Sequence, residues 1–207
     1  NKGLAKSIIG GVTDVINKYG KIIVLEDDHI TAPDFLTYMN SGLDFYEKNT
    51  LIWSISGYTW KMKGFSKYRH DVFMGYRASC WGWASWKDRW EKVQWDVPDF
   101  KEFILDKSAQ QKFNRGGMDM TEMLCQQQRG EINSWAIRWC YQQYKEGMLS
   151  VFPVHSKVKN IGLDGSGTHS GKVASFRTEA EETDQTVFEN LPVCKYLALE
   201  FWSYFSL

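Results

Sequence analysis

The chain has 207 residues, and its 25 basic and 25 acidic side chains leave no formal net charge at pH 7. This balance argues against general nucleic-acid binding and against a strongly electrostatic membrane patch. The length supplies one sizeable core, so we expect a single domain over residues 1–207, with two domains as the alternative.

Four cysteines are scattered along the chain without a CxxC pair or a Cys/His cluster: Cys80, Cys125, Cys140 and Cys194. This spacing argues against a zinc site or a disulfide scaffold and favours a reducing, cytoplasmic setting. The sequence shows no signal peptide and no apolar run long enough to span a bilayer. Aromatic residues make up 15% of the chain and include ten Trp, whose flat faces suit stacking on sugar rings as well as core packing.

The first predicted elements are a helix and a buried strand. Apolar residues recur at helical spacing between Leu4 and Ile16, and Gly20 stands where a glycine would close the helix. Residues 21–25 read Lys-Ile-Ile-Val-Leu, which predicts a strand buried on both faces. Such strands are typical of parallel sheets, so we expect this one to be central, with mostly parallel neighbours.

Three carboxylates, Glu26, Asp27 and Asp28, follow this strand. Ligands of open α/β sheets gather beyond the carboxyl ends of strands, and adjacent acids repel one another unless a cation or many hydrogen-bond donors hold them. Extended geometry would point Glu26 and Asp28 to one side and Asp27 to the other. The alternative is an acidic loop that caps the next helix.

The middle of the chain predicts a helix and two further strands. Residues 31–35 read Thr-Ala-Pro-Asp-Phe, which supplies an N-cap, an early proline and a first-turn acid for a helix. Strands are predicted at 51–56 and 71–74. Between them, the basic and weakly patterned residues 58–70 predict a mobile excursion over the site rather than core.

An aromatic segment comes next, in which Trp81 and Trp83 flank Gly82 in a loop that leads into a helix. One of the two indoles would line a pocket while the other anchors in the core, and the sequence leaves that assignment open. Trp86 and Trp90 lie four residues apart, which predicts a buried stripe on the helix.

The second half of the chain predicts short helices at 91–130, which form either a lid or acceptor-facing insertion or simple packing helices. A capped helix over 134–144 and a strand over 148–154 follow. Residues 157–169 are rich in glycine, and their exposed amides beside Lys and His suit a diphosphate, although turns favour the same residues. Residues 170–207 form a polar stretch and then an aromatic helix, which docks on the core or else touches a membrane interface or a partner.

Three blocks carry a resemblance to a known family. Residues 21–39 read KIIVLEDDHITAPDFLTYM and resemble the metal-site segment of GT-A glycosyltransferases, in particular the family-two bacterial sugar transferases and, more distantly, the N-acetylglucosaminyltransferase I family. Gly-Trp-Ala at 82–84 and Asn-Ile-Gly at 160–162 are similar to two further segments of these enzymes. The resemblance implies an α/β, Rossmann-like GT-A core with a mostly parallel sheet.

The resemblance also implies roles for individual residues. Asp28 would bind a divalent metal, Mn²⁺ or Mg²⁺, that bridges the nucleotide diphosphate, and Glu26 and Asp27 would contact the donor. Further donor contacts are expected at Trp81, Gly82, Trp83, Arg138, Gly162 and His169. His169 could also contact the metal or a phosphate.

The catalytic base departs from the family pattern. Related transferases carry a carboxylate in a segment similar to Asp-Ser-Trp-Ala-Ile-Arg-Trp, whereas this chain has Asn133 at that position. An Asn side chain cannot act as a base. Glu131, two residues earlier, is the alternative base, and its competing interpretation is an exposed loop acid.

These residues predict an inverting transferase that moves a sugar from a nucleotide-diphosphate sugar to a glycan or glycolipid acceptor in cell-surface polysaccharide biosynthesis. We expect it in the cytoplasm, with peripheral contact at the inner face of the membrane through the tail as an option. The family order begins only at Leu4, so the first nucleotide-binding unit is missing and we expect an N-terminally truncated domain. The alternatives are a non-catalytic carbohydrate-binding protein, an inactive transferase fragment, or a metal-dependent phosphotransferase or nucleotidyltransferase, which predicts further acids at neighbouring strand ends.

Overall fold

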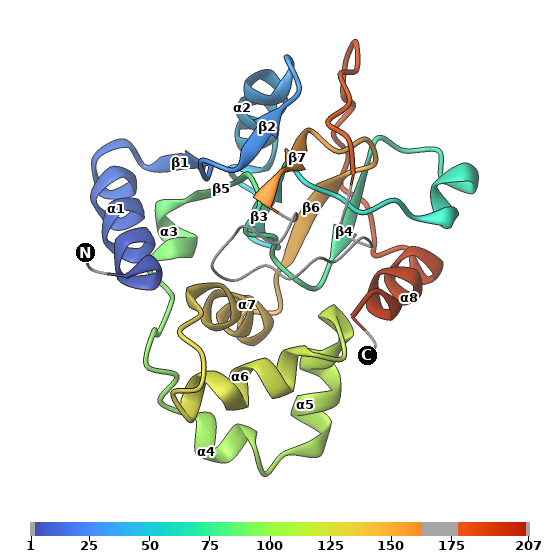
Figure 1. Ribbon diagram of the computed structural model, residues 1–207. Coiled ribbons are helices and arrows are strands. Elements are labelled where there is room, and N and C mark those ends of the chain that lie inside the picture. The colour runs from blue at the N-terminus through green and yellow to red at the C-terminus, as the bar shows by residue number, and fades with distance from the viewer. Residues whose placement is uncertain (1–2, 163–177, 206–207) are drawn as a thin grey trace.

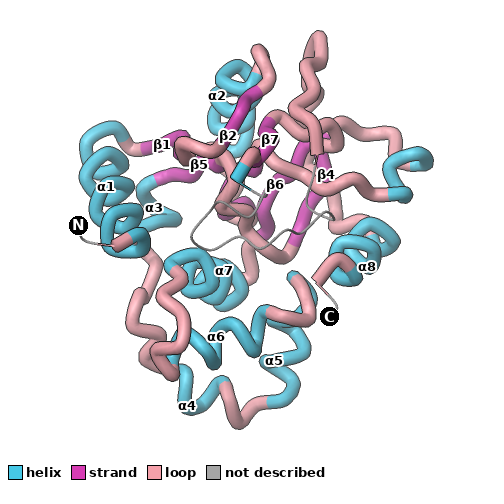
Figure 2. The backbone as a smooth tube through the Cα atoms, in the orientation of Figure 1, coloured by secondary structure: helices cyan, strands magenta, loops and turns pink. Residues whose placement is uncertain are grey.

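The computed structural model describes residues 3–162 and 178–205. Over these residues the chain forms a mixed α/β fold with a five-stranded sheet and a separate two-stranded sheet. Figures 1 and 2 show helices on both sides of the larger sheet, with α4, α5 and α6 gathered at the lower end of the molecule.

The helices are α1 (Leu4–Tyr19), α2 (Phe35–Tyr46), α3 (Lys87–Trp90), α4 (Phe100–Phe103), α5 (Lys107–Phe113), α6 (Met120–Gln128), α7 (Trp135–Lys145) and α8 (Lys195–Ser203), with short 3₁₀ helices η1 (Lys63–Lys67) and η2 (Asn114–Gly116). The strands are β1 (Lys21–Val24), β2 (His29–Thr31), β3 (Ile52–Ser56), β4 (Val72–Gly75), β5 (Trp83–Trp86), β6 (Leu149–Pro153) and β7 (Val158–Asn160). The predicted helices α1, α2 and α7 and the predicted strands β3, β4 and β6 are therefore confirmed.

The larger sheet has the strand order β1-β5-β3-β6-β4. Only β3 and β6 pair in parallel, whereas the β1–β5, β3–β5 and β4–β6 pairs are antiparallel. The expectation of a mostly parallel sheet with Lys21–Val24 at its centre is therefore wrong. The sheet is mixed, and β1 is an edge strand whose four residues are only half-buried.

The reason is that Trp83–Trp86, expected to be a loop and helix start, forms β5 and separates β1 from β3. Side chains alternate across a strand, so Trp83 enters the core on one face while Trp86 enters the core on the other. Trp90, in α3, lies on the same side as Trp83. The predicted helical stripe of Trp86 and Trp90 is therefore wrong.

Two apolar clusters cover the two faces of the sheet. The first contains side chains of α2, β4, β6 and α8, and the second contains side chains of α1 and of the α3–α7 region. Five tryptophans gather in the second cluster: Trp53, Trp83, Trp90, Trp135 and Trp139. Their rings lie in contact, with the centroids of Trp83 and Trp139 4.4 Å apart. Most of the tryptophans in the chain thus build the core.

Residues 58–70 also differ from the expectation of a mobile excursion. Tyr58 and Trp60 are buried in the first cluster, and the ring centroid of Trp60 lies 4.6 Å from that of Phe201 in α8. Leu197 and Phe201 are themselves buried, so the aromatic tail docks on the core. Large aromatic side chains at the start of the segment outweigh its basic surface residues, because each removes a large apolar area from water.

Helix ends follow the local sequence. Gly20 closes α1 in the left-handed conformation, with φ 78°, and its N–H donates to the carbonyl of Ile16. The hydroxyl of Ser134 caps α7 by accepting from the N–H of Ile137 at 3.3 Å. Among the described residues no helix is long and apolar enough to cross a membrane.

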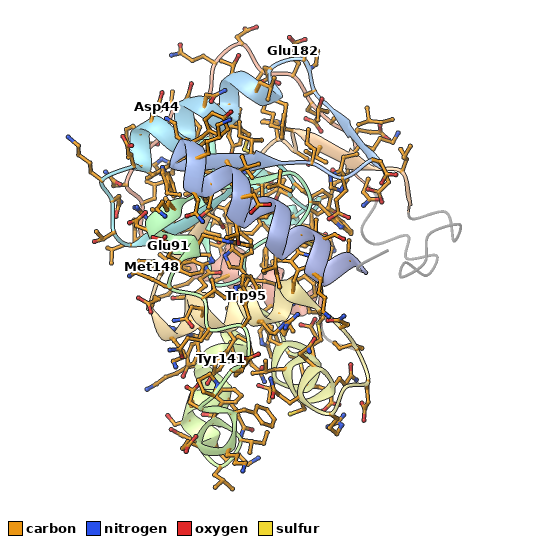
Figure 3. The ribbon with its side chains drawn as sticks, turned by 90° about the vertical axis from the view of Figure 1, so that its left-hand side faces the viewer. Asp44, Glu91, Trp95, Tyr141, Met148 and Glu182 are labelled. Atoms are coloured by element: carbon orange, nitrogen blue, oxygen red, sulfur yellow. The ribbon has the colours of Figure 1, made fainter. Side chains whose placement is uncertain are left out.

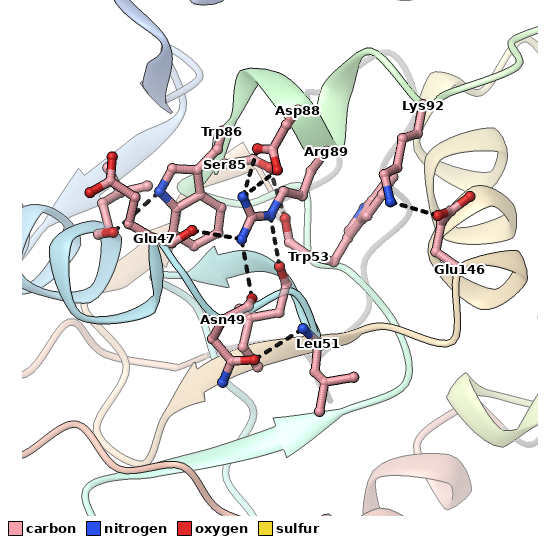
Figure 4. A network of polar contacts seen from close by, with 12 residues as sticks. Glu47, Asn49, Leu51, Trp53, Ser85, Trp86, Asp88, Arg89, Lys92 and Glu146 are labelled. Carbon is pink, nitrogen blue, oxygen red and sulfur yellow. Dashed lines mark hydrogen bonds and ion pairs between the residues drawn. The ribbon is translucent and has the colours of Figure 1, made fainter.

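A buried arginine joins the end of α2 to the sheet (Figure 4). Arg89 is 3% exposed, and its guanidinium donates to the carbonyls of Glu47, Asn49 and Ile52. Asp88 balances the charge with contacts of 2.6 Å. These bonds satisfy backbone carbonyls at the end of α2 and fix the position of α3 and β5.

Candidate functional site

The three acids lie in the short connection between β1 and β2. Asp27 is exposed, whereas Glu26 and Asp28 are half-buried. Burial first, and then the charges of Asp28 and Asp27, raise the pKa of Glu26 to about 7. Glu26 also acts on Cys80, since burial first and the Glu26 charge second raise the pKa of that thiol to about 12.

His29 holds this acidic turn together, and the sequence analysis missed it. Its side chain is 0% exposed, and its Nδ1 accepts from the N–H of Glu26 at 3.2 Å. The ring proton therefore sits on Nε2, which lies 3.4 Å from Oδ1 of Asp28. Burial lowers the pKa of His29, against the opposing effect of the Asp28 and Asp27 charges, so the ring stays neutral. The only signal in the sequence was its position directly after the acids.

The two-stranded sheet brings the Asn-Ile-Gly segment onto Asp28. β2 pairs antiparallel with β7, and the N–H of Ile161 donates to the carbonyl of Asp28 at 2.9 Å. The side chain of Asn160 accepts from the N–H of Gly162 at 2.8 Å. A Cβ on Gly162 would lie 2.5 Å from Oδ2 of Asp28, so only glycine leaves room for this carboxylate. Thr31 was expected to cap the helix after the acids. It is instead the last residue of strand β2, and Asp34 stands at the N-cap position of α2.

Trp81 and Trp83 pack on different apolar clusters. Trp81 is half-buried, with its ring centroid 4.6 Å from that of Tyr58. Trp83 is 0% exposed in the tryptophan cluster, so the expected donor contact at Trp83 is corrected to a core position. Gly82 has φ 58°, and a Cβ there would lie 2.6 Å from Val158 and 3.3 Å from Leu25. Gly82 thus lets the end of β1 and strand β7 pack together.

The expected base residues lie at the start of α7. Glu131 is exposed and paired with Arg129 at 2.6 Å, and this hydrogen bond lowers the pKa of the carboxyl. Asn133 is exposed and accepts from Arg138 at 3.5 Å, while Arg138 also donates to the carbonyls of Ser134 and Trp95. None of these contacts joins the α7 start to residues 26–28 within the described part of the chain. A carboxyl with a lowered pKa is a weak base, which disfavours Glu131.

Asp28 is the expected metal ligand that lies within the described residues. Oδ1 of Asp28 is buried without a hydrogen-bond partner there, and the side chain as a whole is 37% exposed. Among residues 3–162 and 178–205 no group of three or more His, Cys, Asp or Glu is arranged to hold a metal ion. His169, the other expected ligand, lies outside the described residues.

Two cavities lie away from the acids. The larger, of about 360 Å³, lies between α4, α5 and α7 and is lined in part by Asp99, Glu102 and Tyr141. The smaller, of about 270 Å³, lies between α2 and residues 183–188. Figure 3 shows Tyr141 toward the lower end of the molecule and Glu182 at the upper end, so the two cavities are far apart. Neither is lined by residues 26–28.

The described residues form a mixed α/β fold in which three carboxylates follow the end of the edge strand β1. The chain is similar to the alpha-1,3-mannosyl-glycoprotein 2-beta-N-acetylglucosaminyltransferase of Arabidopsis thaliana, at 29% identity over 90 residues. The similar stretch covers 39% of this chain, and the chain spans 20% of the length of that enzyme. No protein-family profile matches the chain. The similarity supports a distant relation to glycosyltransferases.

Proposed function

We propose that this chain is part of a GT-A-like glycosyltransferase that moves a sugar from a nucleotide-diphosphate sugar to a glycan or glycolipid acceptor. The observation that carries the proposal is the Asp28 carboxylate, which stands beyond the end of β1 and lies against the backbone of Gly162. The distant relation to a glycosyltransferase supports the same reading. The donor sugar would lie near Glu26, Asp27 and Trp81.

Asp28 would hold a divalent cation, Mn²⁺ or Mg²⁺, together with the diphosphate of the donor. The cation would neutralise the departing diphosphate, which three carboxylates would otherwise repel. The chain itself positions Asp28 from two sides, because the buried His29 faces one oxygen and Gly162 leaves space for the other. Side chains locked by such packing lose little freedom when the ligand binds.

The acceptor hydroxyl needs a base or an equivalent means of losing its proton. Asn133 cannot accept that proton, and the ion pair with Arg129 makes Glu131 a weak acceptor. We therefore place the start of α7 near the acceptor as a positioning element. Its Ser134 cap and the bonds from Arg138 hold this segment in place.

The test is release of free nucleoside diphosphate from a panel of nucleotide sugars, with and without Mn²⁺. We expect release that depends on metal and increases when a glycan acceptor is added. A parallel thermal-shift series shows which nucleotide sugar stabilises the fold, because a ligand that binds only the native state raises Tm.

Two results would change the proposal. Sugar binding without any release in this chain or in a version extended at the N-terminus would favour the non-catalytic carbohydrate-binding protein. Release only in the extended version would place the nucleotide-binding unit in that extension.

A further inference from the structure

The smaller cavity has a lining that the proposed donor site does not use. Its volume of about 270 Å³ lies near the lower end of ligand sites, on the order of 300 Å³, which suits one small ring rather than a nucleotide. One wall is α2, where Thr37, Tyr38 and Ser41 share a face of the helix. The other wall is the segment 183–188.

Both walls are held in place, so the cavity is preformed. Thr183 is fixed at one end of its segment, because its N–H and hydroxyl donate to Oδ2 of Asp34 at 3.2 and 3.3 Å. The buried Lys157 donates to the same carboxylate oxygen at 2.6 Å. At the other end the N–H of Val187 donates to Asp71 at 2.8 Å. Asp184, Gln185 and Thr186, between these two anchors, line the cavity.

The lining combines hydrogen-bonding groups with aromatic rings. Thr37, Ser41, Thr186 and Gln185 line the cavity, and their side chains make no hydrogen bond to another residue of the described ranges. The half-buried ring of Phe188 supplies the apolar part, and the buried ring of Tyr38 packs against it with the centroids 5.3 Å apart. Hydroxyls and an amide can both donate and accept, as a polyhydroxylated ring requires, while an aromatic face suits the C–H side of such a ring.

The charge of the lining excludes an anionic ligand. Asp34 and Asp184 are both acidic, the described residues of the lining include no Lys or Arg, and the Lys157 ammonium that reaches Asp34 is bonded to it. Oδ1 of Asp34 is buried with no hydrogen-bond partner among the described residues. A phosphate or a nucleotide diphosphate would meet two carboxylates and no free cation. The cavity therefore differs in chemistry from a donor site.

We propose that this cavity binds one uncharged pyranose unit of the acceptor glycan. Asp34 lies six residues after Asp28, and six residues of chain span at most about 22 Å, a distance that a short oligosaccharide can bridge. That the bound ring belongs to an acceptor glycan rests on the proposed function. That the cavity binds a sugar ring rests on its lining alone.

The test is saturation-transfer NMR on this chain with the methyl glycosides of glucose, galactose, mannose and N-acetylglucosamine. Glucose 6-phosphate, whose C–H protons report binding in the same way, is the charged control. We expect transfer to at least one glycoside and none to the sugar phosphate. Ser41→Leu fills the cavity with a larger side chain. It should raise the apparent Kd of the glycoside that binds by about tenfold or more, measured from the transfer at a series of glycoside concentrations. The matched control is Ser7→Leu, because Ser7 is also an exposed helical serine but lies in α1.

The outcomes separate this inference from the proposed function. It is overturned if none of the four glycosides binds, or if Ser41→Leu and Ser7→Leu bind them equally well. Asp28→Ala should remove metal-dependent donor binding and leave glycoside binding unchanged. Ser41→Leu should weaken glycoside binding and leave metal-dependent donor binding unchanged. If the unaltered chain binds no nucleotide-sugar donor, the proposed function is contradicted, whereas the result with the glycosides still holds.

Discussion

Asp28 and His29 show how the site depends on single side chains. The buried, neutral imidazole presents Nε2 to one oxygen of Asp28, so that oxygen is shielded from water, while the carboxylate as a whole stays partly open. The family resemblance implied a metal-binding role for Asp28, which stays a proposal. The structure adds the buried histidine that lies beside the carboxylate.

At this scale we predict that Asp28→Ala removes metal-dependent donor binding, lowering affinity by more than about tenfold. The reason is the loss of the Asp28 carboxylate, which lies against Gly162 and would hold the cation. Calorimetric titration with nucleotide sugar and Mn²⁺ checks it. Asp14→Ala removes an exposed acid of α1 and serves as the control, which should bind like the unaltered chain. Equal affinity in Asp28→Ala would refute the metal assignment.

A second residue-scale prediction concerns the base. Glu131→Gln should change turnover little, because Arg129 already holds the pKa of that carboxyl below its ordinary value. Asn133→Asp should raise turnover on the order of 10²-fold or more if this position faces the acceptor hydroxyl. Initial rates of sugar transfer measure both. A large loss in Glu131→Gln would restore Glu131 as the base.

The elements around the site meet at glycines. Gly82 joins the tryptophan segment to β5 at φ 58°, in the left-handed region, where its missing side chain makes room for Val158 of β7 and Leu25 after β1. One residue therefore sets the spacing between the two sheets. This packing places the end of β1 beside the segment that carries Asn160 and Gly162.

We predict that Gly82→Ala lowers the free energy of unfolding by about 1–3 kcal/mol, since it adds both backbone strain and a clash. Gly10→Ala is the matched control, because that glycine lies inside α1 with nothing within 4 Å of a new Cβ. There the same change should stabilise the protein by about 0.5–1 kcal/mol. Urea unfolding of both variants decides the matter, and a neutral Gly82→Ala would show that the two sheets can move apart freely.

Across the whole molecule, the tail is tied back to the site region through a buried ion pair. Lys157, 1% exposed, joins Asp34 at the start of α2 and also donates to the carbonyl of Glu181 and the hydroxyl of Thr183. Further along, the hydroxyl of Tyr46 donates to the carbonyl of Glu189. Sequence-distant segments are thus fixed against β7 and α2 together.

This pair predicts a loss of stability in acid. Burial alone would raise the pKa of Asp34, but the hydrogen bonds from Lys157 and Thr183 outweigh it and lower the pKa. A lowered native pKa gives stability that is present above the ordinary value near 3.8 and is lost as the pH falls through the native value. Asp34→Asn should therefore cost about 3 kcal/mol at neutral pH and less in acid.

Denaturant unfolding at a series of pH values measures this effect. Asp44→Asn is the control, because Asp44 pairs with Lys21 at the surface, where such pairs contribute about 0–1 kcal/mol. A deficit in Asp34→Asn that stays constant from neutral to acidic pH would show that the carboxylate charge is not what stabilises the tail.

Local patterns in the sequence determined the elements with strong periodicity or capping signals. These were α1 with its glycine cap, α7 with Ser134, the buried strand β3 and the acidic end of β1. Short-range spacing decides such features, because helix and strand periods act within a few residues. The tertiary structure alone decided that β1 is an edge strand, that Trp83 belongs to the core, and that His29 and Gly162 enclose Asp28. Strand order and enclosure depend on pairing between segments far apart in the chain, for which one sequence carries no local signal.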